Sequence, residues 1–527
     1  MVRLVEYSAL SGTSLSRPQY ACLSHCWGKT RSKRITTKET LEANSTGITL
    51  SELPQTFKDA IEVARALHVR YLWIDSMCIV QDDKIDWEHH VKIMAGIYAN
   101  AYITLAAGAS SDDDGGFFRE SPPRFSKPHS FKIADSNCEY EIFLRIRLPH
   151  PDEEDWPGGP VMPLMTRGWV FQERLLSRRF LCFAVNEIMW ECLDDVACSC
   201  STSQHGFNAR FTHELPALLN CAATKYFFAH LSTLHDNKLF GFWRDMVEAY
   251  SQRQISFPSD KLPALDGIRQ VIGRAITGRG ISDTYLFGSW AESLADDLLW
   301  SNDWYDRTAG YRQCEAPSWS WISAAEGSVS WSSNTELIDR RWKLKKIPNV
   351  DQGVESDGGV MIHGNLAVVS LRKVEDEMEK THPGFRSCNV YKQLRPADVT
   401  NPGSTSLAGP LTTNKPPQLQ INIIDDPENP DNLGNIWTDY QFWKDESQLW
   451  SVLEESYFMP FGIENQPPQF EERPSSYCWV GGVLLRDLER DLDGCKTFER
   501  LGWLRYYIDK PKEEYEPSGS YQDVWIM

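Results

Sequence analysis

Two stretches decide the fold: residues 20–28, with the sequence YACLSHCWG, and residues 71–79, with the sequence YLWIDSMCI. Each stretch is an apolar run that ends in small, polar or acidic residues. A buried parallel strand that delivers a functional site at its carboxyl end has this pattern. We therefore predict two strands of a parallel sheet, with Ser24 at the end of the first and Asp75 at the end of the second.

Helical patterns follow both stretches. Apolar residues recur at helical spacing over residues 53–67, where Leu53-Pro54 marks the start, and again over residues 86–98. Residues 101–107 form a third apolar run of strand length. Strands that alternate with helices of this length predict βαβ units with right-handed crossovers. We therefore expect an α/β amino-terminal domain with a TIR/flavodoxin-like parallel sheet flanked by helices.

The rest of this domain is expected to hold a loop region, a short helix and two more strands. Residues 117–165 carry several Pro and acidic residues and are typical of an insertion or a long loop. Residues 168–177 predict a short helix, and residues 179–184 and 187–192 predict two strands joined by a turn around Asn186. The domain as a whole is expected to span residues 1–205.

Two further sections are expected after residue 205. Residues 206–328 form a mainly helical extension, and residues 329–527 form a β-rich carboxyl-terminal region with short alternating apolar runs. Within the extension, helices are predicted at residues 242–250, 262–276 and 290–300. Residues 395–418 are rich in Pro, Thr, Asn and Gly and predict a mobile loop.

Composition limits the classes of protein to which the chain can belong. It has 527 residues, is 41% hydrophobic and 24% charged, and carries a net charge of -19. A chain of this length divides into domains, and its composition is globular. The negative charge excludes a nucleic-acid binder held mainly by phosphate contacts.

The cysteines and the amino terminus predict a cytoplasmic protein. The 13 Cys are an odd number scattered through apolar runs, as expected of buried thiols in a reducing compartment. The first residues have no charged-then-apolar signal pattern. No stretch approaches the roughly 18 apolar residues that a membrane span needs.

A further stretch supplies a carboxylate. Residues 167–177, with the sequence RGWVFQERLLS, place Glu173 one helical turn after Trp169. The stretches described above, in this order, resemble those of the fungal heterokaryon-incompatibility (HET) domain proteins across roughly residues 1–325. Two positions depart from the family pattern, which usually has Tyr at His25 and Leu at Met77.

The resemblance implies a role in fungal self/non-self recognition that ends in growth arrest or cell death. The domain of this family is considered similar to Toll/interleukin-1 receptor (TIR) domains, some of which self-associate and cleave NAD at the nicotinamide–ribose bond. Their catalytic Glu follows a Trp on a short helix after the third strand, a spacing that Trp169 and Glu173 reproduce. The resemblance thus implies self-association and NAD as substrate, without a cofactor. The chain shows no nucleotide-binding switch domain of its own, so we expect an unknown regulatory protein as partner.

Cleavage of that bond passes through an oxocarbenium-like transition state and releases a leaving group that needs no proton. The protein has to supply a carboxylate near the ribose and a dry aromatic wall. We expect Glu173 to be the catalytic carboxylate. The substrate-binding candidates are Trp27 and Trp169 as walls, Ser24, Gly28 and Asp75 at the strand ends, and Arg167 or Arg174 for a phosphate.

Each candidate also has a structural interpretation. Structural ion pairs are the alternative for Glu173, Arg167 and Arg174. Core packing is the alternative for Trp27 and Trp169, and an Asx cap is the alternative for Asp75. His25 is typical of a buried histidine with its hydrogen bonds satisfied, and Cys78 of a buried structural thiol rather than a nucleophile.

Two other motifs in the sequence are not supported by their spacing. Gly28-Lys29-Thr30 is no P-loop, because Leu23 stands where Gly is required. A zinc site of Cys192, Cys198, Cys200 and His205 is disfavoured by its irregular spacing. The alternative function is a non-catalytic signalling module that acts by self-association or partner docking.

Overall fold

The chain packs as two compact units, residues Met1–Gly280 and Ile281–Met527. The sequence predicts instead three sections that divide near residues 205 and 328, and that division of the domains stays a prediction. The computed structural model describes residues 1–6, 18–28, 34–120, 129–135, 138–144, 162–193, 195–199, 225, 228, 230–303, 316–324, 328–331, 342–347, 358–368, 371–373, 419–423, 433–438, 456–465, 478–508 and 520–527.

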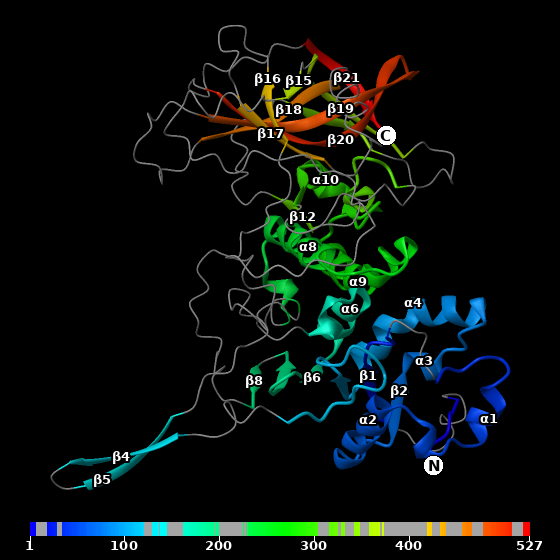
Figure 1. The fold of residues 1–527 in the computed structure, drawn as a ribbon. Coiled ribbons are helices and arrows are strands. Elements are labelled where there is room, and N and C mark those ends of the chain that lie inside the picture. Colours follow the sequence, from blue (N-terminus) through cyan, green and yellow to red (C-terminus); the bar gives the residue numbers. More distant parts are fainter. Residues whose placement is uncertain are drawn as a thin grey trace, which may run out of the picture. The chain divides into compact units, whose positions relative to one another are not determined.

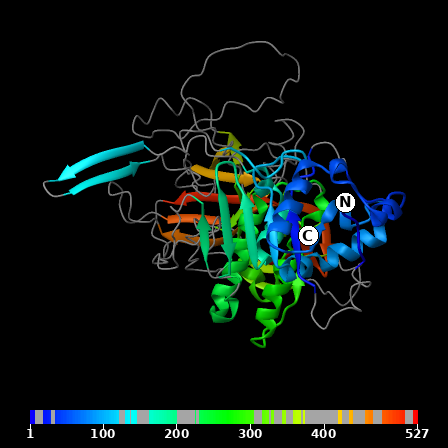
Figure 2. The ribbon, with the colours of Figure 1, turned by 90° about the horizontal axis from the view of Figure 1, so that it is seen from below.

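The first unit is built on a six-stranded mixed sheet in the order β2-β1-β3-β6-β7-β8 (Figure 1). Its strands are β1 (Tyr20–Ser24), β2 (Tyr71–Ile74), β3 (Ile103–Ala106), β6 (Arg179–Phe183), β7 (Ile188–Cys192) and β8 (Val196–Cys198). The pairs β1/β2, β1/β3 and β3/β6 are parallel. The pairs β6/β7 and β7/β8 are antiparallel, and these strands are drawn in teal in Figure 2. The predicted parallel sheet is thus confirmed for four of the six strands, and β7 and β8 are joined to it by antiparallel pairing.

The sheet core explains why the first stretch forms a central strand. Ala21, Cys22 and Leu23 of β1 are fully buried, and β1 has β2 on one side and β3 on the other. The sequential order of the strands reverses between β1 and β3. In open α/β sheets, ligands bind outside the carboxyl ends of the strands at such a reversal.

The expected helices of this unit are present. The helix α2 (Gln55–Ala66) buries Phe57 and Ala60 in the core that contains β1. The helix α4 (Lys84–Asn100) begins two residues before the predicted start, because the Asp83 carboxylate accepts hydrogen bonds from the amides of Ile85 and Asp86. The short helices α1 (Leu41–Thr46) and α3 (Asp75–Cys78) were not predicted.

The insertion predicted at residues 117–165 contains an antiparallel hairpin, β4 (His129–Asp135) with β5 (Cys138–Leu144). The helix α6 (Gly168–Leu176) follows a 3₁₀ turn at Pro163–Thr166 and matches the predicted short helix.

Two long helices complete the first unit: α8 (Asp236–Ser251) and α9 (Pro263–Thr277), which match two of the predicted helices. A Cβ atom added at Gly267 of α9 would lie 2.5 Å from Ala95 of α4 and 2.7 Å from Gln172 of α6. Gly267 therefore allows the backbone of α9 to approach both helices closely.

The predicted helix at residues 290–300 is wrong. That segment consists of β10 (Ser289–Trp290), a 3₁₀ turn at Ala291–Ser293, the single helical turn α10 (Leu294–Asp297), and the start of β11 (Trp300–Asp303). The indoles at its two ends are fully buried. The strands pair with β9 (Tyr285–Leu286) and β12 (Ser328–Trp331), so tertiary pairing overrides the local helical pattern.

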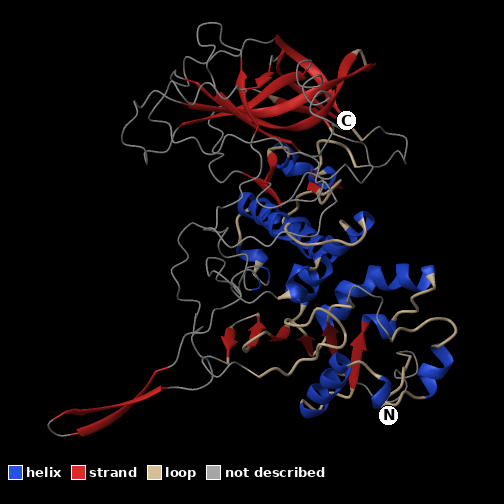
Figure 3. Ribbon diagram, viewed as in Figure 1, coloured by secondary structure: helices blue, strands red, loops and turns tan. Residues whose placement is uncertain are grey.

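The second unit is β-rich, as predicted (Figure 3). Its main sheet has nine strands among the described residues, and β21 pairs with both β14 and β20. The strands are β13 (Lys343–Lys346), β14 (Val360–Val368), β15 (Leu371–Lys373), β16 (Leu419–Ile423), β17 (Leu433–Thr438), β18 (Ser456–Asn465), β19 (Cys478–Leu492), β20 (Cys495–Ile508) and β21 (Ser520–Ile526). The loop predicted at residues 395–418 lies outside the described residues.

A short tryptophan motif organises this unit. The Nε1 atom of Trp319 donates to the carbonyl of Gly358 at 2.8 Å, and that of Trp321 donates to the carbonyl of Gly288 at 2.9 Å. The amide of Ser318 donates to the carbonyl of Met527 at 2.8 Å. Three segments that lie far apart in sequence, at Gly288, Gly358 and Met527, are thus held by residues 318–321.

None of the helices in the described part of the chain combines the length and the apolarity that a bilayer crossing requires.

Candidate functional site

The strand ends bring the first group of predicted residues together. Ser24 is the last residue of β1 and is buried, and Asp75 follows the last residue of β2 directly as the first residue of α3. Because β1 and β2 are parallel neighbours, both residues lie at the same edge of the sheet. The indole Nε1 of Trp27 donates to Oδ2 of Asp75 at 3.0 Å. Gly28 follows with a φ of 87°, a left-handed conformation that favours glycine.

Glu173 reaches this edge from α6. Its side chain is buried, with 6% of the residue exposed. Burial raises the pKa of the Glu173 carboxyl, and the charge of Asp75 adds to the effect. The nearby Ser24 and Tyr98 hydroxyls and the Arg167 guanidinium favour the charged carboxylate and partly oppose the rise in pKa. Glu173 therefore lies among Ser24, Asp75 and Arg167, three of the predicted substrate-binding residues.

Arg167 is placed by the residues that flank it. Its amide donates to the carbonyl of Leu164, and the next amide, of Gly168, donates to the carbonyl of Gln254 at 2.9 Å. The guanidinium donates from Nη1 to the carbonyl of His25. One cation thereby joins the start of α6 to the end of β1.

Several buried polar atoms of this cluster have no hydrogen-bond partner among the described residues. They are Oγ of Ser76, Oε2 of Glu173 and both ring nitrogens of His25. A buried polar group without a partner costs about 1–3 kcal/mol, so such groups are rare and usually have a functional reason. Their concentration at one sheet edge is the arrangement expected of a site for a polar ligand.

His25 connects the site to the segment that follows β3. Its Nε2 lies 3.1 Å from Oδ1 of Asp113, and its Nδ1 lies 3.7 Å from Oδ1 of Asp75. The amide of Thr56 on α2 donates to the carbonyl of Asp113 at 2.9 Å. The carboxylate of Asp59 accepts from the amide of Phe117 at 2.7 Å. The start of α2 thus fixes the Asp113 segment against His25.

Sequence reasoning missed Asp113, Ser76 and Tyr98. Asp113 belongs to an acidic run that has the pattern of an ordinary polar loop, although this loop follows the third strand and therefore lies near the carboxyl edge of the sheet. Tyr98 falls on the buried face of α4 and has the pattern of a core residue.

Two predicted residues have other partners. The guanidinium of Arg174 forms a bidentate pair with the buried Glu191 of β7, with Nε at 3.0 Å and 2.9 Å from its two oxygens. Burial opposes the charge of Glu191, but Arg174 and Lys225 outweigh it and lower the pKa of this carboxyl. The indole of Trp169 donates to Oδ2 of Asp260 at 3.1 Å. Both contacts correspond to the structural interpretations that the sequence leaves open.

The thiols near the site are poor nucleophiles. Burial raises the pKa of Cys78 to about 11. The amide of Ile74 donates to the sulfur and opposes part of this rise. Burial also raises the pKa of Cys22 well above its usual range, and the charge of Glu173 adds to it. Thiols without thiolate character near neutral pH suit a structural role.

Within the described residues, no group of His, Cys, Asp and Glu could hold a metal ion. Of the four candidate zinc ligands, Cys192 lies in β7 and Cys198 in β8, and Cys200 and His205 lie outside the described residues.

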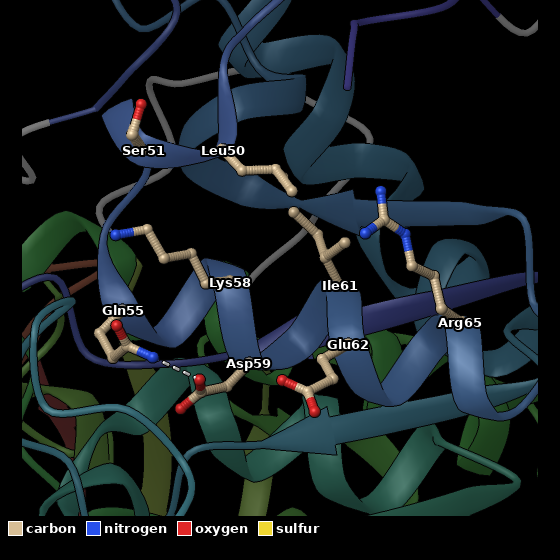
Figure 4. Close-up of a pocket in the computed structure, with 8 residues that line it drawn as sticks. All are labelled: Leu50, Ser51, Gln55, Lys58, Asp59, Ile61, Glu62 and Arg65. Carbon is tan, nitrogen blue, oxygen red and sulfur yellow. Dashed lines mark hydrogen bonds between the residues drawn. The ribbon is translucent and has the colours of Figure 1, made fainter. Parts of the chain in front are cut away.

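A surface hollow of about 500 Å³ lies beside α2 (Figure 4). Its lining includes Gln55, whose side-chain amide donates to Oδ1 of Asp59 at 2.6 Å, and the cations Lys58 and Arg65. The lining contains none of the eight residues predicted for the site. The site at the strand ends is therefore distinct from this hollow.

Comparison with known proteins gives a match to a family model. Residues 20–173 match the family model described as "Heterokaryon incompatibility protein (HET)". The chain carries a HET domain. The matched region runs from the first residue of β1 to Glu173, so the HET domain contains every predicted site residue except Arg174.

One curated relative is the "Heterokaryon incompatibility protein 6, OR allele" of Neurospora crassa, which is 28% identical over 148 residues. The shared stretch covers 26% of this chain and 19% of the relative, so the likeness is confined to a part of each protein. No solved structure matches the chain.

Proposed function

We propose that this chain acts in the cytoplasm as a heterokaryon-incompatibility protein that triggers cell death in fungal self/non-self recognition. We further propose that its HET domain acts by cleaving the nicotinamide–ribose bond of NAD. The match of residues 20–173 supports the first proposal. The second rests on one observation: the buried Glu173 meets Ser24 and Asp75 at the carboxyl ends of parallel strands.

The strand order supports a TIR-like or flavodoxin-like fold as part of this proposal. The four parallel strands follow one another in the sheet as β2-β1-β3-β6, which corresponds to the 2-1-3-4 start of a flavodoxin-like sheet. In that fold the ligand binds at the reversal between the first and third strands. The cluster of Ser24, Asp113 and Glu173 belongs to the same edge.

The chemistry asks little of the protein beyond charge and positioning. Nicotinamide leaves as a neutral molecule, the ribose C1′ becomes oxocarbenium-like, and water adds to C1′. The products are nicotinamide, ADP-ribose and one proton. The Glu173 carboxylate would stabilise the cation, and its raised pKa makes it a better acceptor for the proton of the attacking water than an ordinary carboxylate.

The neighbouring residues would orient the substrate. The hydroxyls of Ser24 and Ser76 suit the ribose hydroxyls, and Arg167 suits a phosphate. Trp27, held by Asp75, would supply an aromatic wall. Glu173 is only 6% exposed, so substrate entry requires the site to open, and we propose that self-association provides this opening.

A second candidate function is a signalling module without catalysis. The burial of Glu173 suits a structural carboxyl. The helix α4 also exposes three apolar side chains that suit docking: Ile85 at 80%, Trp87 at 38% and Ile93 at 41%. In this alternative the HET domain acts by self-association or by binding a regulatory protein.

The test is nicotinamide release from NAD by the purified full chain at high protein concentration. The parent is compared with Glu173→Gln, which keeps the shape of the side chain, and with Glu62→Gln, which alters an exposed carboxyl of α2. We expect release by the parent and by Glu62→Gln but none by Glu173→Gln. Equal release by all three proteins would remove Glu173 from the mechanism, and no release by any of them would favour the signalling module.

A further inference from the structure

The first turn of α6 is bound by the loop between α8 and α9, residues 252–262. The amide of Gly168, the first residue of α6, donates to the carbonyl of Gln254 at 2.9 Å, and the amide of Gln254 donates to the carbonyl of Thr166 at 2.6 Å. Arg167 and Gln254 thereby form a parallel bridge outside the named strands. The bridge fixes the backbone of Arg167, whose guanidinium reaches the end of β1.

This bridge takes the place of a side-chain cap. The first four amides of an α-helix have no partner within the helix, and the side chain of the residue before the helix often accepts from one of them. In α6 that residue is Arg167, whose side chain has no acceptor and forms no cap hydrogen bond. The carbonyl of Gln254 accepts from the first of these amides instead. The start of α6 therefore depends on a residue far along the chain.

The approach of the loop to α6 is too close for any side chain at Gly168. A Cβ atom added there would overlap Cδ1 of Ile255 and lie 3.0 Å from its Cγ1. The carbonyl oxygen of Gln254 would lie 3.5 Å away, which is an ordinary contact. The side chain of Ile255 is thus the obstacle that a larger residue at this position would meet.

Two side-chain contacts extend the binding of the loop along α6. The guanidinium of Arg253 lies over the ring of Phe171, 4.7 Å from its centre. The indole of Trp169 donates to Oδ2 of the buried Asp260 at 3.1 Å. Figure 1 shows α6 beside α8 and α9, the two helices that the loop connects. The loop therefore holds the first turn of α6 through its backbone and its side chains.

We propose that the α8–α9 loop is a positioning element of the candidate site: the bridge at Gln254 holds Arg167, and with it Glu173, at the carboxyl edge of the sheet. Arg167 joins α6 to the carbonyl of His25 and acts on the charge of Glu173. The family match ends at residue 173, so the loop lies outside it. The bridge itself is independent of catalysis, whereas its effect on NAD cleavage rests on the proposed function.

Amide hydrogen exchange of the full chain tests the bridge without relying on catalysis. Gly168→Ala places a methyl group against Ile255, and the double variant Gly168→Ala with Ile255→Ala removes the obstacle. We expect exchange in residues 166–171 to be about tenfold faster in Gly168→Ala than in the parent, because the helix start loses a backbone hydrogen bond. The double variant should return close to the parent. The control Gly96→Ala, whose added methyl group has its nearest atom at 3.9 Å, should leave these residues unchanged.

Two results of this experiment would overturn the inference. The first is exchange in residues 166–171 that is equal in Gly168→Ala and in the parent. The second is exchange that is as fast in the double variant as in Gly168→Ala, because the contact with Ile255 would then not be the cause.

The pH profile of nicotinamide release from NAD separates positioning from a general loss of structure. The charge of Arg167 favours the ionised carboxylate of Glu173, so displacement of Arg167 should raise the pKa of this carboxyl further. The acid limb of the profile should therefore move to higher pH in Gly168→Ala and return in the double variant. A rate that falls equally at every pH would assign the loop a merely structural role and overturn the inference. Absence of nicotinamide release from every protein, with the exchange pattern intact, would overturn only the proposed function.

Discussion

At the scale of single residues, the pair of Arg174 and Glu191 has a definite energetic consequence. Replacing Arg174 with Met leaves the buried Glu191 without its bidentate partner. Breaking a buried pair from one side costs about 3–5 kcal/mol, and the partial exposure of Arg174 favours the lower end. We expect Arg174→Met to lower the free energy of unfolding by about 3 kcal/mol in urea denaturation, and the double variant with Glu191→Met to lose clearly less. A double variant less stable than Arg174→Met would contradict the structural role.

Glu173 gives the stability of the protein a pH dependence of known sign. Its folded-state pKa is raised above the ordinary value of 4.5, so the folded state binds the proton more tightly than the unfolded state. The resulting stability is fully present below about pH 4.5 and is lost as pH rises through the raised pKa. Relative to Glu173→Gln, the parent should therefore lose stability with rising pH in chemical denaturation. A parallel pH dependence in the two proteins would show that Glu173 is not desolvated.

The residues that sequence reasoning located are those governed by the strand-end rule. Ser24 and Asp75 follow apolar strands directly, so the parallel pairing alone brings them to one edge. Asp113 and the His25 contact depend on how α2 fixes a loop far along the chain, which no local pattern encodes. Arg174 and Trp169 lie beside Glu173 in sequence, but their side chains reach other partners.

At the scale of elements, α6 takes its place from the close packing of α9. Replacing Gly267 with Ala puts a methyl group 2.5 Å from Ala95 and 2.7 Å from Gln172, the residue before Glu173. We expect Gly267→Ala to cost about 1–3 kcal/mol in denaturant unfolding and to displace α6. The matched change Gly96→Ala, on the exposed side of α4, has its nearest atom at 3.9 Å and should stabilise the protein by up to about 1 kcal/mol. Equal effects of the two substitutions would contradict this packing.

Elements with clear local signals were predicted, and elements set by distant pairing were not. The helices α2, α8 and α9 and the strands β6 and β7 appear where periodicity and turn residues indicate. The predicted helix at residues 290–300 fails because Trp290 and Trp300 pair in two different sheets. Over so short a segment, the spacing of apolar residues cannot distinguish a helix from short strands that pair with distant segments.

At the scale of the whole molecule, two compact units predict two unfolding transitions, and the tryptophan motif belongs to the second unit. Trp319→Phe removes the bond to the Gly358 carbonyl, whereas Trp525→Phe removes an indole nitrogen that has no hydrogen-bond partner among the described residues. The first change should cost about 1–3 kcal/mol more than the second. In calorimetry we expect Trp319→Phe to lower the transition of the second unit by about 2–4 °C per kcal/mol lost and to leave the other transition unchanged. Equal shifts in the two variants would contradict the role of the motif.

The most direct test of cell death through NAD cleavage by Glu173 follows NAD content and viability together in fungal cells that express the whole chain. The parent, Glu173→Gln and Glu62→Gln are brought to equal protein levels. We expect NAD to fall before the cells die with the parent and with Glu62→Gln, and NAD and viability to be preserved with Glu173→Gln. Death of the cells that express Glu173→Gln at the rate seen with the parent would contradict this expectation.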